Sequence, residues 1–400
     1  GRLFLFSIGG FTFVVFKTYK MNDMKGKQGM VCMGLLLVLS SCHTGKQITA
    51  SGLQRKDFQT EVNGQHTDLF TLSNKQGMEV CITNYGARVV SILVPDRNGK
   101  REDVVCGFST ITEYMEQRQN FGSTVGRYIG RILNARFTLD GVEYKLVPNN
   151  GKSGHISHGG NPGFADRIWK VEQADTHRVR LSYLSPDGEN GFPGNLKVTL
   201  VYSLGEDDNA LDLTYEATTD APTVLNLSHH SFFNISGNFT KSVEDQQLWV
   251  DADRFTPYDD KKCVTGEYLQ VAGTPLDFRM PHAIGECIDA DHPQLKVVNG
   301  YDHTWELNTK GDDTRPAAWV YDPASGRKME IFTTEPGMQI YTGNGLKGKM
   351  TGKRGIAYPF RSAVCFETMH FQDSPNQPGF PSTVLRPGEV FRSHTVYKFE

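Results

Sequence analysis

The chain has 400 residues, 38% of them hydrophobic, which is enough to bury a large apolar core in one large domain or two ordinary ones. Its formal charge is −3 at pH 7, and its Lys and Arg residues gather only in short pairs, which excludes the electrostatic footprint of a nucleic-acid-binding protein. The 41 Gly and 18 Pro residues separate short alternating apolar runs, and this pattern favours an all-β, turn-rich fold.

The beginning of the chain carries an apolar run over residues 3–16, upstream of Met21. This run is shorter than the roughly 20 residues that a membrane-spanning helix needs. We therefore interpret residues 1–20 as an extension that precedes the true start at Met21 and takes no part in the fold. A membrane segment is the alternative interpretation.

Residues 21–41 have the layout of an export signal. Two lysines precede an apolar stretch over residues 31–39, and the sequence LSSC then ends at Cys42. This layout resembles a bacterial lipoprotein signal peptide, which implies that Cys42 becomes lipidated and that residues 42–56 form a tether. The protein is then expected to be exported, as a periplasmic or outer-membrane-anchored lipoprotein whose only membrane contact is the lipid. An ordinary secretory signal is the alternative.

The body of the chain, residues 57–400, is predicted to form one β-sandwich domain. Apolar and polar residues alternate with a period of two in the segments 177–185, 196–204 and 210–219, which is typical of half-buried antiparallel strands. Turn-forming residues fill the gaps between these segments. The best helical candidate, STITEYMEQ at 109–117, is short, and no linker or repeat divides the body.

Cysteines of the body are scattered along it at positions Cys81, Cys106, Cys263, Cys287 and Cys365. Their odd number and the absence of any CxxC spacing indicate neither a disulfide framework nor a zinc site. Buried apolar side chains are the simplest interpretation, although an exported protein could pair two of them.

Several polar segments, dense in Gly, His, Asn and aromatic residues, are typical of carbohydrate sites, where side chains bind hydroxyls and stack on sugar rings. Taken together and in order, they resemble the aldose 1-epimerase (galactose mutarotase) family. The segments are NYGARVVSILVPDRNGK (84–100), DVVCGF (103–108), FGSTVGRYIGRI (121–132), SHGGNPGF (157–164), LNLSHHSFFNISG (225–237), GTPLDFR (273–279), GYDHTWEL (300–307), TTEPGMQIYTGN (333–344) and VCFETMHFQDSPNQPGFPS (364–382).

This resemblance implies an antiparallel β-supersandwich enzyme that interconverts the α and β anomers of free aldohexoses such as glucose and galactose, without a cofactor or metal. It places the catalytic base on Glu367 and the acid on His230. Glu367 should start ionised and His230 protonated, and we expect each to favour the charged form of the other. The neighbouring His229 is expected to point to the opposite face of the strand and to be structural.

The resemblance also implies a set of sugar contacts, and a structural role is the alternative at each position. The set consists of Arg131, His158, Ser231, Phe232, Asp277 and Gln339. Asp277 has a specific alternative, because Asp277 and Arg279 could pair with other residues. Arg131 could equally pair with an acid at a sheet edge.

Two departures from the family pattern concern the sugar site. Gly130 stands where the family usually has Asn, so one sugar contact is missing or supplied elsewhere, and Phe232 replaces a Tyr. The alternatives for function are a non-catalytic carbohydrate-binding lipoprotein and an epimerase-like enzyme for a different or phosphorylated sugar. We expect a small-molecule sugar as the partner and a monomer or weak dimer as the assembly.

Overall fold

The structure is a computed structural model that describes residues 3–8, 11–16 and 48–400. The chain divides into two units, residues 1–43 and 44–400. In the first unit, β1 (Leu3–Ile8) and β2 (Phe11–Phe16) pair as an antiparallel hairpin. The predicted signal peptide and the predicted lipidation site Cys42 lie outside the described residues.

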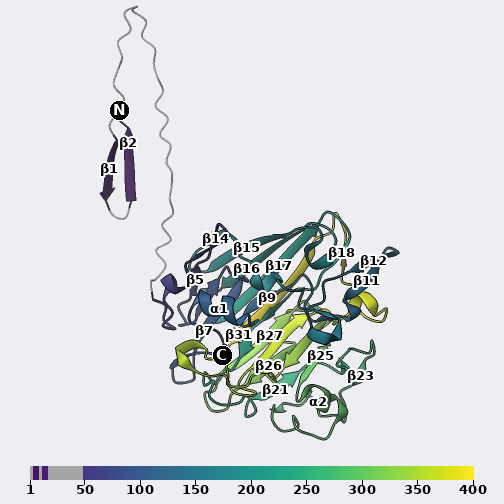
Figure 1. The fold of residues 1–400 in the computed structure, drawn as a ribbon. Helices are drawn as coiled ribbons and strands as arrows, with labels where there is room; N and C mark the ends of the chain where they lie inside the picture. The colour runs from purple at the N-terminus through teal and green to yellow at the C-terminus, as the bar shows by residue number, and fades with distance from the viewer. Residues whose placement is uncertain (1–2, 9–10, 17–47) are drawn as a thin grey trace, which may run out of the picture. The chain divides into compact units, whose positions relative to one another are not determined.

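Antiparallel sheets build the second unit, which confirms the predicted all-β class (Figure 1). The largest sheet has nine strands in the order β14 (Lys170–Ala174), β15 (Arg178–Ser185), β16 (Leu196–Leu204), β17 (Ala210–Thr219), β31 (Phe391–Phe399), β27 (Lys328–Thr333), β26 (Ala318–Tyr321), β21 (Gln247–Val250) and β24 (His282–Ala283). The three strands predicted from alternation are β15, β16 and β17, and their bounds agree within one residue.

Two further sheets complete the framework. One has six strands in the order β20 (Phe232–Phe233), β29 (Val364–Met369), β28 (Gly337–Tyr341), β25 (Asp302–Glu306), β22 (Arg254–Thr256) and β23 (Leu269–Gln270). The other has four strands: β5 (Leu69–Ser73), β6 (Glu79–Thr83), β7 (Arg88–Pro95) and β8 (Arg101–Asp103). Short pairs join β9 (Ser123–Val125) to β19 (Ser228–His230), β10 (Arg131–Ile132) to β13 (Ile156–Ser157), β11 (Arg136–Leu139) to β12 (Val142–Lys145), β18 (Thr223–Val224) to β30 (Val384–Leu385), and β3 (Glu61–Val62) to β4 (Gln65–His66).

The main core contains side chains from all three large sheets. Leu200 of β16, Val80 of β6 and Ile340 of β28 belong to the same buried apolar cluster. Because successive residues of a strand point to opposite faces, each sheet contributes every second side chain to this core. The other face of the six-stranded sheet is therefore free to carry polar groups.

Helices are few and short. The predicted helix is α1 (Ile111–Gln117), which begins after a capping box in which the Thr110 side chain accepts from the Glu113 N–H and the Glu113 carboxylate accepts from the Thr110 N–H. The second α-helix is α2 (Pro293–Val298). Single 3₁₀ turns are η1 (Arg55–Phe58), η2 (Leu133–Ala135), η3 (Gly151–Ser153), η4 (Phe164–Asp166), η5 (Glu189–Gly191), η6 (Lys353–Gly355) and η7 (Ser374–Asn376). Within the part of the chain that the structure describes, no helix has the length and apolar character needed to cross a membrane.

Residues 48–56, which the sequence analysis assigned to a tether, pack on the domain instead. Leu53 is buried, and the backbone N–H groups of Ala50 and Ser51 donate to the carboxylate of Glu79. A free tether would leave these N–H groups to water, whereas here the buried carboxylate satisfies them. The ordered domain thus includes residues that precede Asp57.

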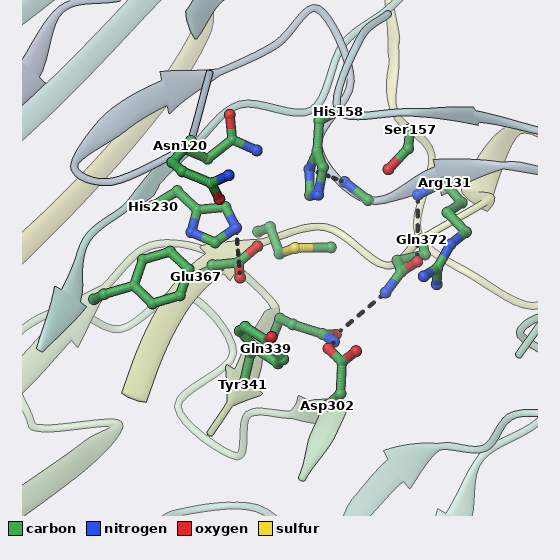
Figure 2. Close-up of a pocket in the computed structure, with 14 residues that line it drawn as sticks. Asn120, Arg131, Ser157, His158, His230, Asp302, Gln339, Tyr341, Glu367 and Gln372 are labelled. Carbon is green, nitrogen blue, oxygen red and sulfur yellow. Dashed lines mark hydrogen bonds and ion pairs between the residues drawn. The ribbon is translucent and has the colours of Figure 1, made fainter. Parts of the chain in front are cut away.

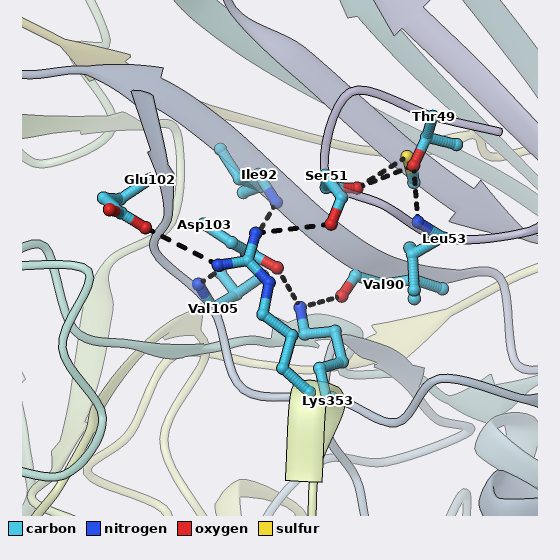
Figure 3. A network of polar contacts seen from close by, with 12 residues as sticks. Thr49, Ser51, Leu53, Val90, Ile92, Glu102, Asp103, Val105 and Lys353 are labelled. Carbon is cyan, nitrogen blue, oxygen red and sulfur yellow. Dashed lines mark hydrogen bonds and ion pairs between the residues drawn. The ribbon is translucent and has the colours of Figure 1, made fainter. Parts of the chain in front are cut away.

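A buried ion pair joins η6 to the four-stranded sheet (Figure 3). The ammonium of Lys353 lies 2.5 Å from Oδ2 of Asp103 and donates to the carbonyl of Val90. The other carboxylate oxygen of Asp103 accepts from the N–H groups of Ile92 and Val105. Both charges are desolvated, so each depends on the other for its compensation.

Replacing Lys353 by Met should therefore destabilise the fold, because it leaves the Asp103 carboxylate buried without its cation. We expect the free energy of unfolding to fall by about 3–5 kcal/mol, measured by chemical denaturation. The matched control is Lys75→Met, since Lys75 is exposed and pairs with Glu206 on the surface. The control should change the stability by less than about 1 kcal/mol. Equal effects of the two substitutions would contradict the assignment.

Candidate active site

A cavity of about 260 Å³ opens above one face of the six-stranded sheet (Figure 2). Polar side chains dominate its wall, and they come from segments far apart in the sequence. The lining residues are Gln119, Asn120, Gly130, Arg131, Ser157, His158, His230, Phe232, Asp302, Gln339, Tyr341, Glu367, Met369 and Gln372.

Strands β28 and β29 supply part of this cavity through their alternation. Met338 and Ile340 of β28 point into the core, whereas Gln339 and Tyr341 line the cavity. In β29, Glu367 lies on the cavity face, directly opposite Gln339 in the antiparallel register. The polar groups therefore stand on strands whose other face is fixed by the core, which makes them rigid.

His230 and Glu367 meet in this cavity, as the sequence analysis predicts. Nε2 of His230 lies 3.4 Å from Oε1 of Glu367, and the two residues are only 6% and 4% exposed. The His230 ring stacks on Phe232, with ring centroids 5.1 Å apart. On its other side, Nδ1 of His230 lies 3.6 Å from Sγ of Cys365. Apolar and weakly polar neighbours thus hold the imidazole in place while its Nε2 faces the carboxylate.

Burial decides the protonation of this pair. It raises the pKa of Glu367 well above its usual value, and the negative charge of Asp302 raises it further. Burial also lowers the pKa of His230 well below its usual value, followed by the effect of His158. In this pair the effect of burial exceeds the mutual stabilisation of the charged forms that we expected. Desolvation disfavours both charges, and the pair is driven toward a neutral imidazole and a neutral carboxylic acid.

His158 presents a donor to the same cavity. Its backbone lies in the left-handed region, with φ at 52°, and its Nδ1 accepts from the backbone N–H of Gly130 at 3.4 Å. Burial, and then the charge of Arg131, lower the pKa of His158 to about 4. A neutral imidazole whose Nδ1 accepts must carry its proton on Nε2. His158 is therefore a neutral hydrogen-bond donor above about pH 5.

Asp302 and Gln339 form a second polar group. The amide nitrogen of Gln339 donates to Oδ1 of Asp302 at 2.7 Å, and its oxygen accepts from the hydroxyl of Thr304 at 2.5 Å. Burial raises the pKa of Asp302, while Arg131 and Gln339 lower it. These two hydrogen bonds fix the orientation of the Gln339 amide. The carboxylate of Asp302 can still accept a hydrogen bond from a ligand hydroxyl.

The structure brings Arg131, His158, Phe232 and Gln339 to the cavity as predicted, but not Ser231. The Ser231 hydroxyl hydrogen-bonds to Nε2 of His229 at 2.7 Å. His229 packs beside Tyr202 and Tyr397, and burial lowers its pKa to about 3. This confirms the structural role predicted for His229. Our assignment of Ser231 to the sugar is corrected, because its hydroxyl is engaged by that structural histidine.

Asp277 also lies away from the cavity lining. Its carboxylate is held by Arg279, with Nε to Oδ1 at 2.9 Å and Nη2 to Oδ2 at 2.8 Å. Asp277 therefore has the structural role that was the alternative to a sugar contact. The acid that lines the cavity instead is Asp302, on the neighbouring segment GYDHTWEL.

Several lining residues besides Asp302 were not predicted from the sequence. Tyr341 follows Gln339 by two residues, so strand alternation could have placed it on the same face. Asn120 sits in a loop held by the buried guanidinium of Arg88, which donates to the carbonyls of Gln119 and Phe121. Gln372 follows the end of β29, where no periodic signal applies.

A metal site is a further chemistry to weigh. In the described ranges 3–8, 11–16 and 48–400, the donor atoms of His230, Cys365 and Glu367 lie within 4.8 Å of one another. Burial raises the pKa of the Cys365 thiol well above its usual value, so a metal would have to displace a proton that is held more tightly than at an exposed cysteine. The absence of a metal remains a prediction.

Comparisons with known proteins indicate one family. Residues 68–398 match the family model described as Aldose 1-epimerase. The chain is 40% identical to the galactose mutarotase of Bos taurus over 331 residues, which is 82% of this chain and 93% of the relative. It is 36% identical to the aldose 1-epimerase of Escherichia coli K12 over 340 residues, 84% of this chain and 96% of the relative.

Solved structures give the same result. An aldose epimerase homologue from C. elegans superposes with a TM-score of 0.77 at 31% identity, covering 84% of this chain and 99% of that one. The galactose 1-epimerase of Lactobacillus acidophilus superposes with a TM-score of 0.74 at 28% identity, covering 85% and 96%. Since the family model spans most of the chain and relatives exceed 30% identity over nearly their whole length, this chain belongs to the aldose 1-epimerase family.

Proposed function

We propose that this protein is an aldose 1-epimerase that interconverts the α and β anomers of free aldohexoses such as glucose and galactose. One observation carries the proposal: an imidazole and a carboxylate face each other at 3.4 Å inside a polar cavity of about 260 Å³. The names of the relatives, galactose mutarotase and aldose 1-epimerase, support the same reaction.

The pair supplies the two proton transfers that ring opening needs. The cycle starts from the ionic one-proton form of the pair, in which Glu367 is a carboxylate and His230 an imidazolium. Glu367 takes the proton of the anomeric hydroxyl, and the electrons of that O–H bond form the carbonyl at C1. The bond between C1 and the ring oxygen breaks, and the ring oxygen receives a proton from His230. Rotation about the bond between C1 and C2 presents the other carbonyl face, and the reverse transfers close the ring as the other anomer.

Burial favours the open-chain stage of this cycle. The forward transfers convert an ionised carboxylate and an imidazolium into a neutral acid and a neutral imidazole, so two charges leave a desolvated site. The raised pKa of Glu367 and the lowered pKa of His230 express this preference. The ionic form of the pair (carboxylate and imidazolium) and its neutral form (carboxylic acid and imidazole) share the same single titratable proton. Activity should therefore follow the fraction of the protein in which the pair holds one proton.

The neighbouring groups have roles in holding the sugar. The Nε2–H of His158 and the guanidinium of Arg131 are donors, and the carboxylate of Asp302 is an acceptor. Arg131 is the single Arg or Lys among the described residues that line the cavity, and two carboxylates line it as well. This balance favours a neutral sugar over a phosphorylated one.

We also propose that the mature protein is an exported lipoprotein-type member of the family, anchored through a lipid on Cys42. Support comes from the sequence LSSC at the end of the apolar stretch. Mass spectrometry of the mature N-terminus tests this, since an unmodified N-terminal residue would contradict it and Cys42→Ala should abolish any acylation.

Replacing Glu367 by Gln should remove the base while keeping the size of the side chain. We expect kcat for mutarotation of fresh α-D-glucose or α-D-galactose, followed by polarimetry, to fall about 10²- to 10⁴-fold. The matched control is Glu306→Gln, since Glu306 stands on β25 and pairs with Arg254. A Glu367→Gln variant as fast as the control would remove Glu367 as the base. A wild type that does not accelerate either sugar would overturn the proposed function.

The pH dependence of kcat/KM should reflect the one-proton state of the pair. As pH falls through the lowered pKa of His230, a second proton joins the pair and no base is left. As pH rises through the raised pKa of Glu367, the last proton leaves and no acid remains. We therefore expect a broad maximum whose acid limb lies below pH 6.5. An acid limb at or above that pH would contradict the burial argument.

A further inference from the structure

Gly130 leaves room for a second side chain at the wall of the cavity. A Cβ atom placed on Gly130 would lie 2.5 Å from Cγ of Gln372 and 3.0 Å from its Cδ. Real Cβ atoms do not approach other carbons so closely. The backbone of Gly130 also has φ at 75°, which glycine adopts freely. Gln372 therefore occupies the space that a side chain at position 130 would need.

The amide of Gln372 is held by partners from three other segments. Its oxygen accepts from the backbone N–H of Arg131 at 3.2 Å, and its nitrogen donates to the hydroxyl of Tyr258 at 2.7 Å. The same nitrogen lies 3.3 Å from the amide oxygen of Gln339. The residue is only 5% exposed. A backbone N–H can only donate, so the carbonyl end of Gln372 must face Arg131.

These contacts determine what Gln372 can offer a ligand. Both hydrogens of its amide nitrogen have protein partners, whereas its oxygen has two lone pairs and one protein donor. Gln372 can therefore accept one further hydrogen bond. In Figure 2 it lies beside Arg131, on the opposite side of the drawn cavity from His230 and Glu367. An acceptor next to a guanidinium donor suits one hydroxyl, which donates and accepts at once.

We propose that Gln372, for which the absence of a side chain at Gly130 leaves space, determines the sugar specificity of this site. It accepts a hydrogen bond from one ring hydroxyl remote from the anomeric carbon, and it supplies the contact that the missing side chain at position 130 does not. The bulk of the Gln372 side chain also narrows the cavity. A sugar with a large substituent on the carbon that carries this hydroxyl is therefore excluded. This inference rests on the proposed epimerase function.

The test compares Gln372→Met, which keeps the bulk but removes the acceptor, with wild type on a parent hexose and a series of deoxyhexoses that each lack one hydroxyl. We expect kcat/KM for the parent sugar to fall about tenfold, mainly through KM, because the pair His230 and Glu367 is unchanged. With one deoxyhexose, whose missing hydroxyl is the partner of Gln372, the two proteins should be equal. The matched control is Gln173→Met, since Gln173 is exposed on β14 and its side chain donates to Asp175.

Three outcomes would contradict the proposed role of Gln372. If wild type epimerises the parent sugar and Gln372→Met matches it throughout, this inference fails alone. If the loss is the same with every deoxyhexose, Gln372 has a structural role and not a specificity role. If wild type is inactive, the proposed function fails and the inference with it.

A stability measurement tests the steric part separately. Gly130→Ala should lower Tm, since its Cβ meets Gln372, and the double variant Gly130→Ala/Gln372→Ala should recover part of that loss. Additive losses in the double variant would show that Gln372 does not fill the space beside Gly130.

Discussion

In β28 and β29, successive side chains point to opposite faces of the six-stranded sheet, and this alternation separates an apolar core from a polar cavity. Met338 and Ile340 pack in the core, whereas Gln339 stands in the cavity opposite Glu367. A slip of one residue in either strand would exchange the two faces. The core thus fixes the register, and the register fixes where the carboxylate stands.

The same arrangement holds the Glu367 side chain in a cavity that is shielded from water. Glu367 and His230 are almost fully buried, and neither has a strong ionic partner other than the other one within the described residues. Although the two groups face each other at 3.4 Å, their burial disfavours both charges more strongly, and the pair is driven toward a neutral acid and a neutral imidazole. A sugar that passes a proton between them lets the pair alternate between its two one-proton forms.

Much of this could be predicted from the sequence, where local rules apply. Period-two alternation located β15, β16 and β17, and the opposite orientation of adjacent strand residues assigned His229 and His230 to different roles. The motif resemblance placed the acid and the base. The predictions that were wrong concern residues whose positions depend on contacts between distant segments.

Asp277 and Asp302 illustrate that failure. Both are acids in segments that resemble the family, and only the three-dimensional pairing shows that Arg279 engages Asp277 while Asp302 lines the cavity. Gln372 is similar, because its position depends on the space left by Gly130, more than two hundred residues earlier in the chain. Residues 48–56 were assigned to a tether since their partner Glu79 cannot be identified from local pattern.

The most direct test of the central claim is a double-mutant cycle on the mutarotation rate with Glu367→Gln, His230→Gln and the combined variant. If the two side chains act on one sugar in a single coupled proton exchange, the combined variant should be no slower than the slower single variant, within about threefold. If the two losses instead multiply, the carboxylate and the imidazole contribute independently, and the account of a shared proton in one cavity is wrong.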